Sequence, residues 1–418
     1  LNGNGDTALR VSPFTRALRK QPLGGASVTR LLHILCSVLI PFCTAVVALP
    51  SPLAARERPF SPGSARAQAM GMTWIACTAP EDAAFFNPAW LASEDERFTI
   101  IRLRTGANSD GLALLFGQTG DDIRMFGSDS GAGIPPRGFM DTMTGFDAVY
   151  ETSGPLFLSY KGEGFGIGLY SSSRGGFNAH GTTLPTATLE HDFDIGAIAG
   201  LALPITLDED TGLQLLLGGT IKYLVRIRHI ASEVPLTEAS RLVDPFAFSG
   251  DFRIGQAIGS DLGITWRTPY FSVGVVWYDW FGTTLSWNEY SGDFKTKDTK
   301  LEDTHITPMI GAGIAWTPPD LFGLPSWLFS NTQIAIDVRG FLEEEDSFFK
   351  MLHIGFESTF LHFATIRLGI NAGYPTCGLA FLLFGGLNLE YTLATEERGR
   401  LPGQNPLTLH TISVTLML

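Results

Sequence analysis

Three basic residues share one face of a predicted strand near the middle of the chain. In segment 211–228, Lys222, Arg226 and Arg228 occupy alternate positions, and side chains two residues apart in a strand point to the same face. Cations grouped on an apolar wall can bind the carboxylate of a ligand. The alternative is that they pair with carboxylates on neighbouring strands and bind no ligand.

Two further arginines fit the same pattern. Arg339 follows Asp337, and Arg367 precedes Asn371, in segments that also alternate in polarity. A basic residue that faces lipid at mid-membrane costs about 2–4 kcal/mol, so in a membrane barrel these side chains must face inward. The sequence therefore predicts five inward-facing cations, Lys222, Arg226, Arg228, Arg339 and Arg367, and the family resemblance given below implies a ligand carboxylate that they would contact.

Catalytic motifs are not evident. The glycines of Gly162–Gly168 lie inside a strand pattern with no helix after it, so they are no dinucleotide fingerprint. Segment Gly127–Gly131 has Asp129 at its centre, where a nucleophile elbow requires serine. The 8 histidines are scattered, and neither His-Glu-x-x-His nor Cys-x-x-Cys occurs. The sequence thus predicts no enzyme, no cofactor and no metal site.

The elements that must position the basic residues are short strands. Ile366, Leu368 and Ile370 alternate with more polar residues, and a period of two is typical of strands with one apolar face. Segments of this kind recur with Gly, Pro or charged turns between them, which indicates antiparallel hairpins. We find 14 such segments, within 98–117 and at 155–161, 164–171, 190–204, 211–228, 258–267, 271–280, 307–317, 331–340, 350–360, 364–372, 376–384, 386–394 and 407–417.

This pattern predicts an all-β fold, a transmembrane antiparallel β-barrel of about 14 strands with a small N-terminal hatch in its lumen. Most connections alternate between short turns and longer polar loops, as in outer-membrane barrels. Trp277, Tyr278, Trp280 and Phe281 are expected in an interfacial aromatic girdle. A soluble sandwich or barrel would show the same alternation with its faces reversed, so periodicity alone does not decide between them.

The N-terminus carries the only long apolar run. Residues 31–49 follow a basic region and precede small residues at Val46–Ala48 and Ala65–Ala69, the order of a secretory signal peptide. The alternatives are a membrane-spanning helix, which needs about 20 apolar residues, and a lipoprotein anchor. We expect residues 1–69 to hold the signal and adjoining non-barrel segments, residues 70–96 the hatch, and residues 97–418 the barrel.

Composition narrows the class of protein further. The net charge is −13, and removal of residues 1–69 makes the remainder more acidic, so a nucleic-acid partner is not expected. The chain has 47 glycines, and only 17% of its residues are charged, which fits a barrel better than a soluble exported protein. Beyond residue 69, Cys77 and Cys377 are far apart in sequence and form no disulfide framework.

A compact apolar element precedes the first strand. Glu81–Phe86 can form a short helical turn that must stop before Pro88, because proline disfavours helical conformation at the residue before it. Asn87-Pro88-Ala89 then begins a turn. The expected neighbours in the packing of this hatch are Phe85, Phe86, Trp90 and Leu91.

The order Gly71-Met72, then Asp82-Ala83, then Asn87-Pro88-Ala89, between a signal and a 14-stranded barrel, resembles the hatch of FadL-type outer-membrane transporters. The closing stretch Gly369–Leu418 is similar to FadL-like paralogues of spirochaetes. The resemblance implies passive uptake of long-chain fatty acids or other hydrophobic compounds, with release by movement of the hatch. It also implies lateral exit through a kinked third strand, here Gly164–Tyr170, where Gly164, Gly166 and Gly168 alternate.

The expected setting follows from that class. Partners would be a hydrophobic small molecule, outer-membrane lipid and the barrel-assembly machinery, and the chain would act as a monomer in the outer membrane. Two alternatives stay open. One is a structural or accessory barrel that binds partner proteins through its external loops. The other is a porin for small polar solutes, which would need an open lumen.

Overall fold

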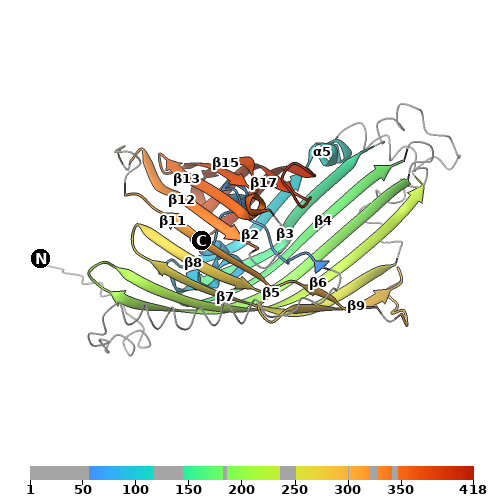
Figure 1. Cartoon of the computed structure of the whole chain (residues 1–418), viewed down its shortest axis with the longest axis horizontal. Helices are drawn as coiled ribbons and strands as arrows, with labels where there is room; N and C mark the ends of the chain where they lie inside the picture. The colour runs from blue at the N-terminus through green and yellow to red at the C-terminus, as the bar shows by residue number, and fades with distance from the viewer. Residues whose placement is uncertain are drawn as a thin grey trace, which may run out of the picture. The chain divides into compact units, whose positions relative to one another are not determined.

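The structure is a computed structural model that describes residues 56–116, 145–181, 186–235, 251–299, 301–319, 325, 327–340 and 347–418 (Figure 1). The predicted export signal at 31–49 and the Gly127–Gly131 segment lie outside these residues. The described strands belong to one sheet. The helices within the described residues are all too short or too polar to cross a membrane.

The wall strands follow one another in chain order. They are β2 (Arg97–Ala107), β3 (Asp147–Gly162), β4 (Phe165–His180), β5 (Thr186–Asp208), β6 (Leu213–Pro235), β7 (Phe252–Arg267), β8 (Phe271–Tyr278), β9 (Thr283–Tyr290), β10 (Thr304–Ile306), β11 (Met309–Trp316), β12 (Phe329–Arg339), β13 (Leu352–Phe360), β14 (Ala364–Asn371), β15 (Tyr374–Leu382), β16 (Leu387–Glu397) and β17 (Pro406–Met417). Figure 1 shows β3 to β6 as long neighbouring arrows.

The sheet closes on itself. β17 pairs with β2, with Val414 opposite Leu103, and the other wall strands pair antiparallel with their neighbours. β8 and β9 together fill one wall position, and β10 and β11 fill the next. The described wall is therefore a closed barrel of 14 antiparallel strands. Each predicted segment overlaps one wall strand, so the predicted fold class is confirmed.

The two faces of the wall differ in polarity. Outward-facing Leu201 and Ile258 are 72% and 71% exposed, whereas inward-facing Arg226 and Asp261 are 2% and 3% exposed. An apolar exterior around a polar interior reverses the arrangement of a soluble barrel. The structure therefore decides between the two alternatives that periodicity left open. The predicted inward direction of the basic face of β6 is confirmed as well.

A plug built from the N-terminal part of the described chain lies inside the barrel. Its elements are β1 (Arg56–Glu57), α3 (Ala65–Ala69), η1 (Pro80–Asp82), α4 (Ala83–Phe86) and η2 (Pro88–Ala92). The remaining short helices are α5 (Ser109–Phe116), α8 (Phe348–Met351) and η4 (Phe384–Gly386). α3 contacts β14 to β17, and η2 contacts β4 to β7. The plug thus reaches opposite parts of the wall.

The plug begins earlier than the predicted hatch at 70–96. The helix α3 starts after Ser64, whose hydroxyl accepts a hydrogen bond from the Ala67 N–H, and Ala69 is fully buried. Arg66 donates to Glu357 of β13 and to the Cys77 carbonyl. Cleavage at the small residues of Ala65–Ala69 would remove β1 and much of α3, whereas cleavage near Val46–Ala48 would keep them.

Glycines line the wall where the backbone of the plug lies against it. A Cβ on Gly218 would stand 2.2 Å from the Pro88 carbonyl oxygen, and one on Gly369 would stand 2.2 Å from the Gly71 nitrogen. Such contacts with backbone atoms leave no room for a larger residue. We call the inward glycines at which a Cβ would meet backbone or side-chain atoms of the plug the glycine belt: Gly166, Gly168, Gly200, Gly218, Gly263, Gly274, Gly311, Gly313, Gly355, Gly369 and Gly378.

Candidate functional site: a cavity above the plug

A cavity of about 390 Å³ lies between the plug and the wall. Its apolar lining comes from both parts: Phe60, Met72, Trp74, Phe85 and Phe86 of the plug, and Tyr170, Ile198, Tyr278 and Met309 of the wall. Charged residues of the wall line the rest of the cavity, among them Arg226, Asp261 and Arg339. An apolar cavity with a few polar groups is the usual form of a small-molecule site.

Trp74 is fixed at the floor of this cavity. Its backbone N–H donates to Asp337 Oδ2 at 2.7 Å, and its indole Nε1–H donates to the Tyr278 hydroxyl at 2.6 Å. The Phe86 ring packs on the indole with centroids 5.0 Å apart. Tyr278 therefore faces inward, and its predicted place in an outer aromatic girdle is wrong. Adjacent strand residues point to opposite faces, so Trp277 and Tyr278 could not both lie in a girdle.

The Asn87-Pro88-Ala89 motif forms a corner of the plug. Asn87 is fully buried, and its side-chain oxygen accepts a hydrogen bond from the Ala89 N–H at 3.1 Å, which caps η2. Its amide nitrogen donates to the Ile75 carbonyl at 2.6 Å and to the Thr265 hydroxyl of β7 at 3.1 Å. The motif thus joins two segments of the plug to the wall.

The four predicted packing residues of the hatch lie around this corner. Leu91 is fully buried, and the Phe85 ring contacts the rings of Phe157 and Tyr170 at 5.6 Å each. Phe86 packs on Trp74, and the Trp90 indole donates to the Ile75 carbonyl at 3.2 Å. Phe85 and Phe86 also line the cavity, so the same residues hold the plug and form part of the candidate site.

Four of the five predicted carboxylate-binding cations are already paired within the protein. Lys222 lies 2.8 Å from Asp261 and 3.0 Å from Asp279, and Arg367 bonds Glu357 and Glu390. Arg226 and Arg228 each bind an aspartate of β5 through two nitrogens. For these four, the structure supports the alternative in which neighbouring carboxylates neutralise the cations, because antiparallel pairing brings them within contact distance.

Arg339 is different. Among the described residues it makes no ion pair, and its Nε is buried without a hydrogen-bond partner. Its Nη2 lies 2.9 Å from His353 Nε2, and its guanidinium carbon lies 3.7 Å from the centre of the Trp74 ring. Asp337, two residues earlier, uses Oδ2 for the N–H groups of Trp74 and Ile75. Of the five candidates, Arg339 therefore keeps donor capacity toward the cavity.

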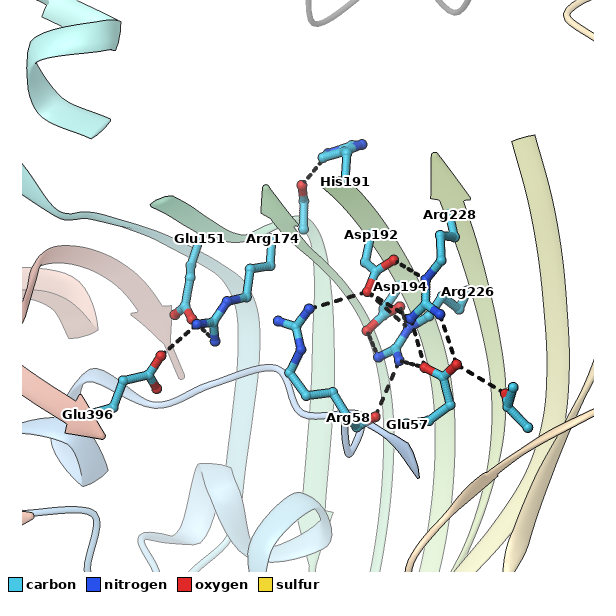
Figure 2. A network of polar contacts seen from close by, with 12 residues as sticks. Glu57, Arg58, Glu151, Arg174, His191, Asp192, Asp194, Arg226, Arg228 and Glu396 are labelled. Atoms are coloured by element: carbon cyan, nitrogen blue, oxygen red, sulfur yellow. Dashed lines mark hydrogen bonds and ion pairs between the residues drawn. The ribbon is translucent and has the colours of Figure 1, made fainter. Parts of the chain in front are cut away.

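Figure 2 shows a network of carboxylates and arginines beside the cavity. Arg174 bridges Glu151 and Glu396 at 2.8 and 2.6 Å, and Glu57 of the plug lies between Arg226 and Arg228. Sequence reasoning missed Glu57, which lies 171 residues from Arg228 in the chain. Nothing in the local sequence marks it, because Arg56–Glu57 is a strand of only two residues.

Burial alone would raise the pKa of Glu57, but the hydrogen bonds and charge of Arg228, with the charge of Arg226, outweigh it and lower that pKa. Glu57 is therefore an anion over the physiological pH range. In the core of the plug, burial raises the pKa of the Cys77 thiol to about 12, although Arg66 acts in the opposite direction. A thiol in this state reacts poorly while the plug is in place.

The structure also brings Ser173 and His191 together, with Ser173 Oγ 2.8 Å from His191 Nε2. Sequence analysis assembled no such pair. A catalytic base needs a group that orients its second ring nitrogen. Within the described part of the chain, no carboxylate or amide bonds that nitrogen of His191, so this pair lacks an essential part of a hydrolytic site.

The predicted exit strand is regular where a kink was expected. From Phe165 to Tyr170, β4 pairs without interruption with both β3 and β5. Gly166 and Gly168 meet Leu91 and Phe85 of the plug, and Gly164 forms the turn before the strand. Register shifts occur instead in β3. The pairing of β3 with β4 shifts between Ser153 and Phe157, and its pairing with β2 shifts in the same region. The small residues of β4 therefore make room for the plug.

The fold and the site define a class, namely a barrel of 14 strands with an apolar exterior and an internal plug. No family model matches the sequence. No curated protein matches it either. The fold is established here by strand pairing and by the polarity of the two faces.

Solved structures similar to this chain include two structures of TodX and one of a FadL homologue. A deletion mutant of the TodX monoaromatic hydrocarbon channel has 14% identity and a TM-score of 0.48, covering 85% of this chain and 98% of its own. The Pseudomonas putida toluene transporter TodX has 13% identity and a TM-score of 0.44, covering 87% and 99%. A Pseudomonas aeruginosa FadL homologue has 11% identity and a TM-score of 0.43, also covering 87% and 99%.

Proposed function

We propose that this protein is a passive outer-membrane channel for hydrophobic small molecules, with long-chain fatty acids as the ligand class to test first. The observation that carries the proposal is the cavity of about 390 Å³, whose floor consists of Trp74, Phe85 and Phe86. This volume falls within the range of roughly 300–1,000 Å³ that is typical of small-molecule sites. The apolar exterior of the barrel supports a place in a membrane.

In this proposal Arg339 receives the anionic head of a ligand. Its guanidinium lines the cavity and has no carboxylate partner in the described chain, so a ligand carboxylate could supply the missing acceptor. The apolar tail would then lie on the aromatic rings of the plug. Release would follow when the plug moves, since the plug forms the floor of the cavity.

The test is displacement of a fluorescent long-chain fatty acid from the folded protein in detergent. We expect saturable binding, and a loss of roughly tenfold or more in Arg339→Gln, because a hydrogen bond to a charged group is removed. Arg339→Lys keeps the charge and should lose less. A fatty alcohol of the same length should bind both variants and the parent chain alike, since it carries no anionic head.

The alternatives give distinct results. A folded barrel with no saturable binding of either acid or alcohol would contradict the channel proposal and favour an accessory barrel that binds partners through its loops. Free passage of small polar solutes through reconstituted protein would favour a porin. The described part of the lumen does not support a porin, because α3 and η2 of the plug contact opposite parts of the wall.

A further inference from the structure

The first described residues of the plug, Arg56 to Gly63, form what we call the strap. Its two-residue strand β1 pairs parallel with β10, so that Glu57 lies opposite Ile306. Residues Arg58 to Gly63 line the cavity. The strap therefore joins the outer wall of the cavity to α3, the first helix of the plug.

Glu57 occupies a slot that is built for a carboxylate. Its Oε1 accepts from Arg228 Nη1 at 2.8 Å and from the Thr304 hydroxyl at 3.1 Å. Its Oε2 accepts from Arg228 Nη2 at 2.7 Å and from Arg226 Nη1 at 3.0 Å. Only 7% of Glu57 is exposed, so the slot encloses the anion and supplies donors to both of its oxygens.

The two guanidinium groups are held by carboxylates of the wall, and Arg226 also touches the strap, with its Nη1 3.3 Å from the Arg58 carbonyl oxygen and its guanidinium carbon 4.2 Å from the centre of the Phe60 ring. Arg226 binds Asp194 through Nε and Nη2, which leaves Nη1 for Glu57 (Figure 2). Arg228 is held by Asp192 in the same way and lies 5.1 Å from the centre of the Trp287 ring. If Glu57 left, these contacts would keep the guanidinium groups in place, so the slot is preorganised for another carboxylate.

An apolar pocket adjoins the slot. The Phe60 ring is 8% exposed and lies in a cluster with Leu224, Ala257, Leu285, Trp287 and Ile306 of the wall. The strap thus places an anion, Glu57, and an apolar ring, Phe60, three residues apart into neighbouring polar and apolar sites. An amphiphilic carboxylic acid has the same two features.

We propose that the Arg226–Arg228 slot and the Phe60 pocket form a binding site for amphiphilic carboxylates, in which Glu57 and Phe60 of the strap are the resting occupants. A ligand binds there by replacing Glu57, and β1 then separates from β10. This site is distinct from Arg339 and rests on the proposed function, since it assumes that such ligands reach the cavity.

The strap is a tethered competitor, and its effective concentration at the slot is on the order of millimolar for a short flexible tether. Glu57→Gln removes the competing anion and leaves Arg226 Nη1 and Arg228 Nη1 without a carboxylate acceptor from the strap. We therefore expect the affinity for a fluorescent long-chain fatty acid to rise by about tenfold or more. The affinity for the matching fatty alcohol should stay within about twofold, because the slot recognises the anion.

Two variants control for folding and for charge. Glu57→Gln combined with Arg228→Gln should lose the gain in affinity, because the slot itself is removed. Glu151→Gln makes the lumen more positive by the same amount, but it changes the Arg104 and Arg174 contacts of the wall and none of the hydrogen bonds of Glu57. An equal gain in Glu151→Gln would overturn the proposal in favour of a general electrostatic effect. Heat-modifiable migration on gels verifies that each variant is folded.

Cross-linking tests the exchange directly. Arg56 and His305 are paired residues of β1 and β10, so Arg56→Cys with His305→Cys, in a chain whose four native cysteines are replaced by serine, should form a disulfide under oxidant. The fatty acid should slow this reaction, and the alcohol should not. An unchanged rate at saturating fatty acid would overturn the proposal, because the ligand would then bind with the strap docked.

The outcomes separate this inference from the proposed function. If the parent chain binds neither acid nor alcohol, the channel proposal fails. If it binds both and Glu57→Gln changes neither affinity, the channel proposal stands and the slot is only a structural anchor of the plug. If acid affinity rises in Glu57→Gln alone and ligand slows cross-linking, both proposals are supported.

Discussion

The inward faces of β5, β6 and β7 have two compositions along the same strands. Where the plug lies against them, the inward residues are glycines: a Cβ on Gly218 or Gly263 would meet the plug backbone, and one on Gly200 would meet the Leu91 side chain of the plug. Further along the same faces, beside the cavity, they are paired charges such as Asp194, Arg226 and Asp261. Inward and outward side chains alternate with a period of two in both regions. The regions differ only in what lies opposite the strand, which is the plug in one and the cavity in the other.

This difference shows what sets the size of an inward side chain. Opposite the plug, backbone atoms occupy the space, so only a residue without Cβ fits. Opposite the cavity no backbone competes, so long side chains reach across to neighbouring strands and neutralise one another. The plug is therefore part of the packing of the wall, whereas ion pairs such as Lys222–Asp261 and Arg226–Asp194 form within the wall itself.

The largest expected effect comes from adding a side chain to the glycine belt. In Gly218→Val the new atoms would meet the Pro88 backbone, which cannot yield as a flexible side chain can. We expect η2 to leave its place, at a cost of roughly 5 kcal/mol or more, above the usual range for overpacking. Labelling of Cys77 by a maleimide, in a chain whose other three cysteines are replaced by serine, should rise from negligible to complete.

The neighbouring residue supplies a matched control for that prediction. Gly219 lies on the opposite face of β6, and a Cβ there would come no closer than 3.4 Å to Leu262. Gly219→Ala should therefore leave Cys77 protected. Protection of Cys77 in Gly218→Val would show that the belt tolerates volume and that the contrast between the two regions is accidental.

The strands were predictable because alternation is local. Each of the 14 predicted segments overlaps a wall strand, but β9 and β10 lie outside them, and the outer ends of β3 to β7 extend well beyond them, as at Ser171–His180 of β4. Those ends are rich in Ser, Gly and charged residues and show no apolar alternation, and ladder hydrogen bonds to long neighbours hold them in the sheet.

The site was predictable only in part, because its partners are distant in sequence. Alternation placed Arg226 and Arg339 inward, but it could not show that Asp194 neutralises the first and that the second stays without a carboxylate. Glu57 gave no signal, since its role depends on where β1 lies in the folded barrel. Glycines such as Gly166 suggested a flexible exit, whereas they meet the plug.

A second prediction concerns the charged region. Lys222 lies between Asp261 and Asp279, and all three side chains are under a tenth exposed. Lys222→Met would leave two buried carboxylates without their cation, which costs about 3–5 kcal/mol when one member of a buried ion pair is removed. Urea unfolding of the barrel should show this loss while Cys77 stays protected in the folded fraction. Exposure of Cys77 at low urea would mean that the charged region also holds the plug.

The smallest expected effect sharpens the contrast between enclosed and open ion pairs. Arg58 reaches Asp192 at 3.3 Å, but 48% of its side chain is exposed, and Asp192 is already held by Arg228 at 2.7 Å. Solvent screens such a pair, so Arg58→Gln should cost less than about 1 kcal/mol and leave Cys77 protected. The same urea series as for Lys222→Met provides the measurement. If Arg58→Gln lowers the free energy of unfolding as much as Lys222→Met does, the strap depends on the charge of Arg58. Enclosure by the wall would then not be what gives the luminal ion pairs their strength.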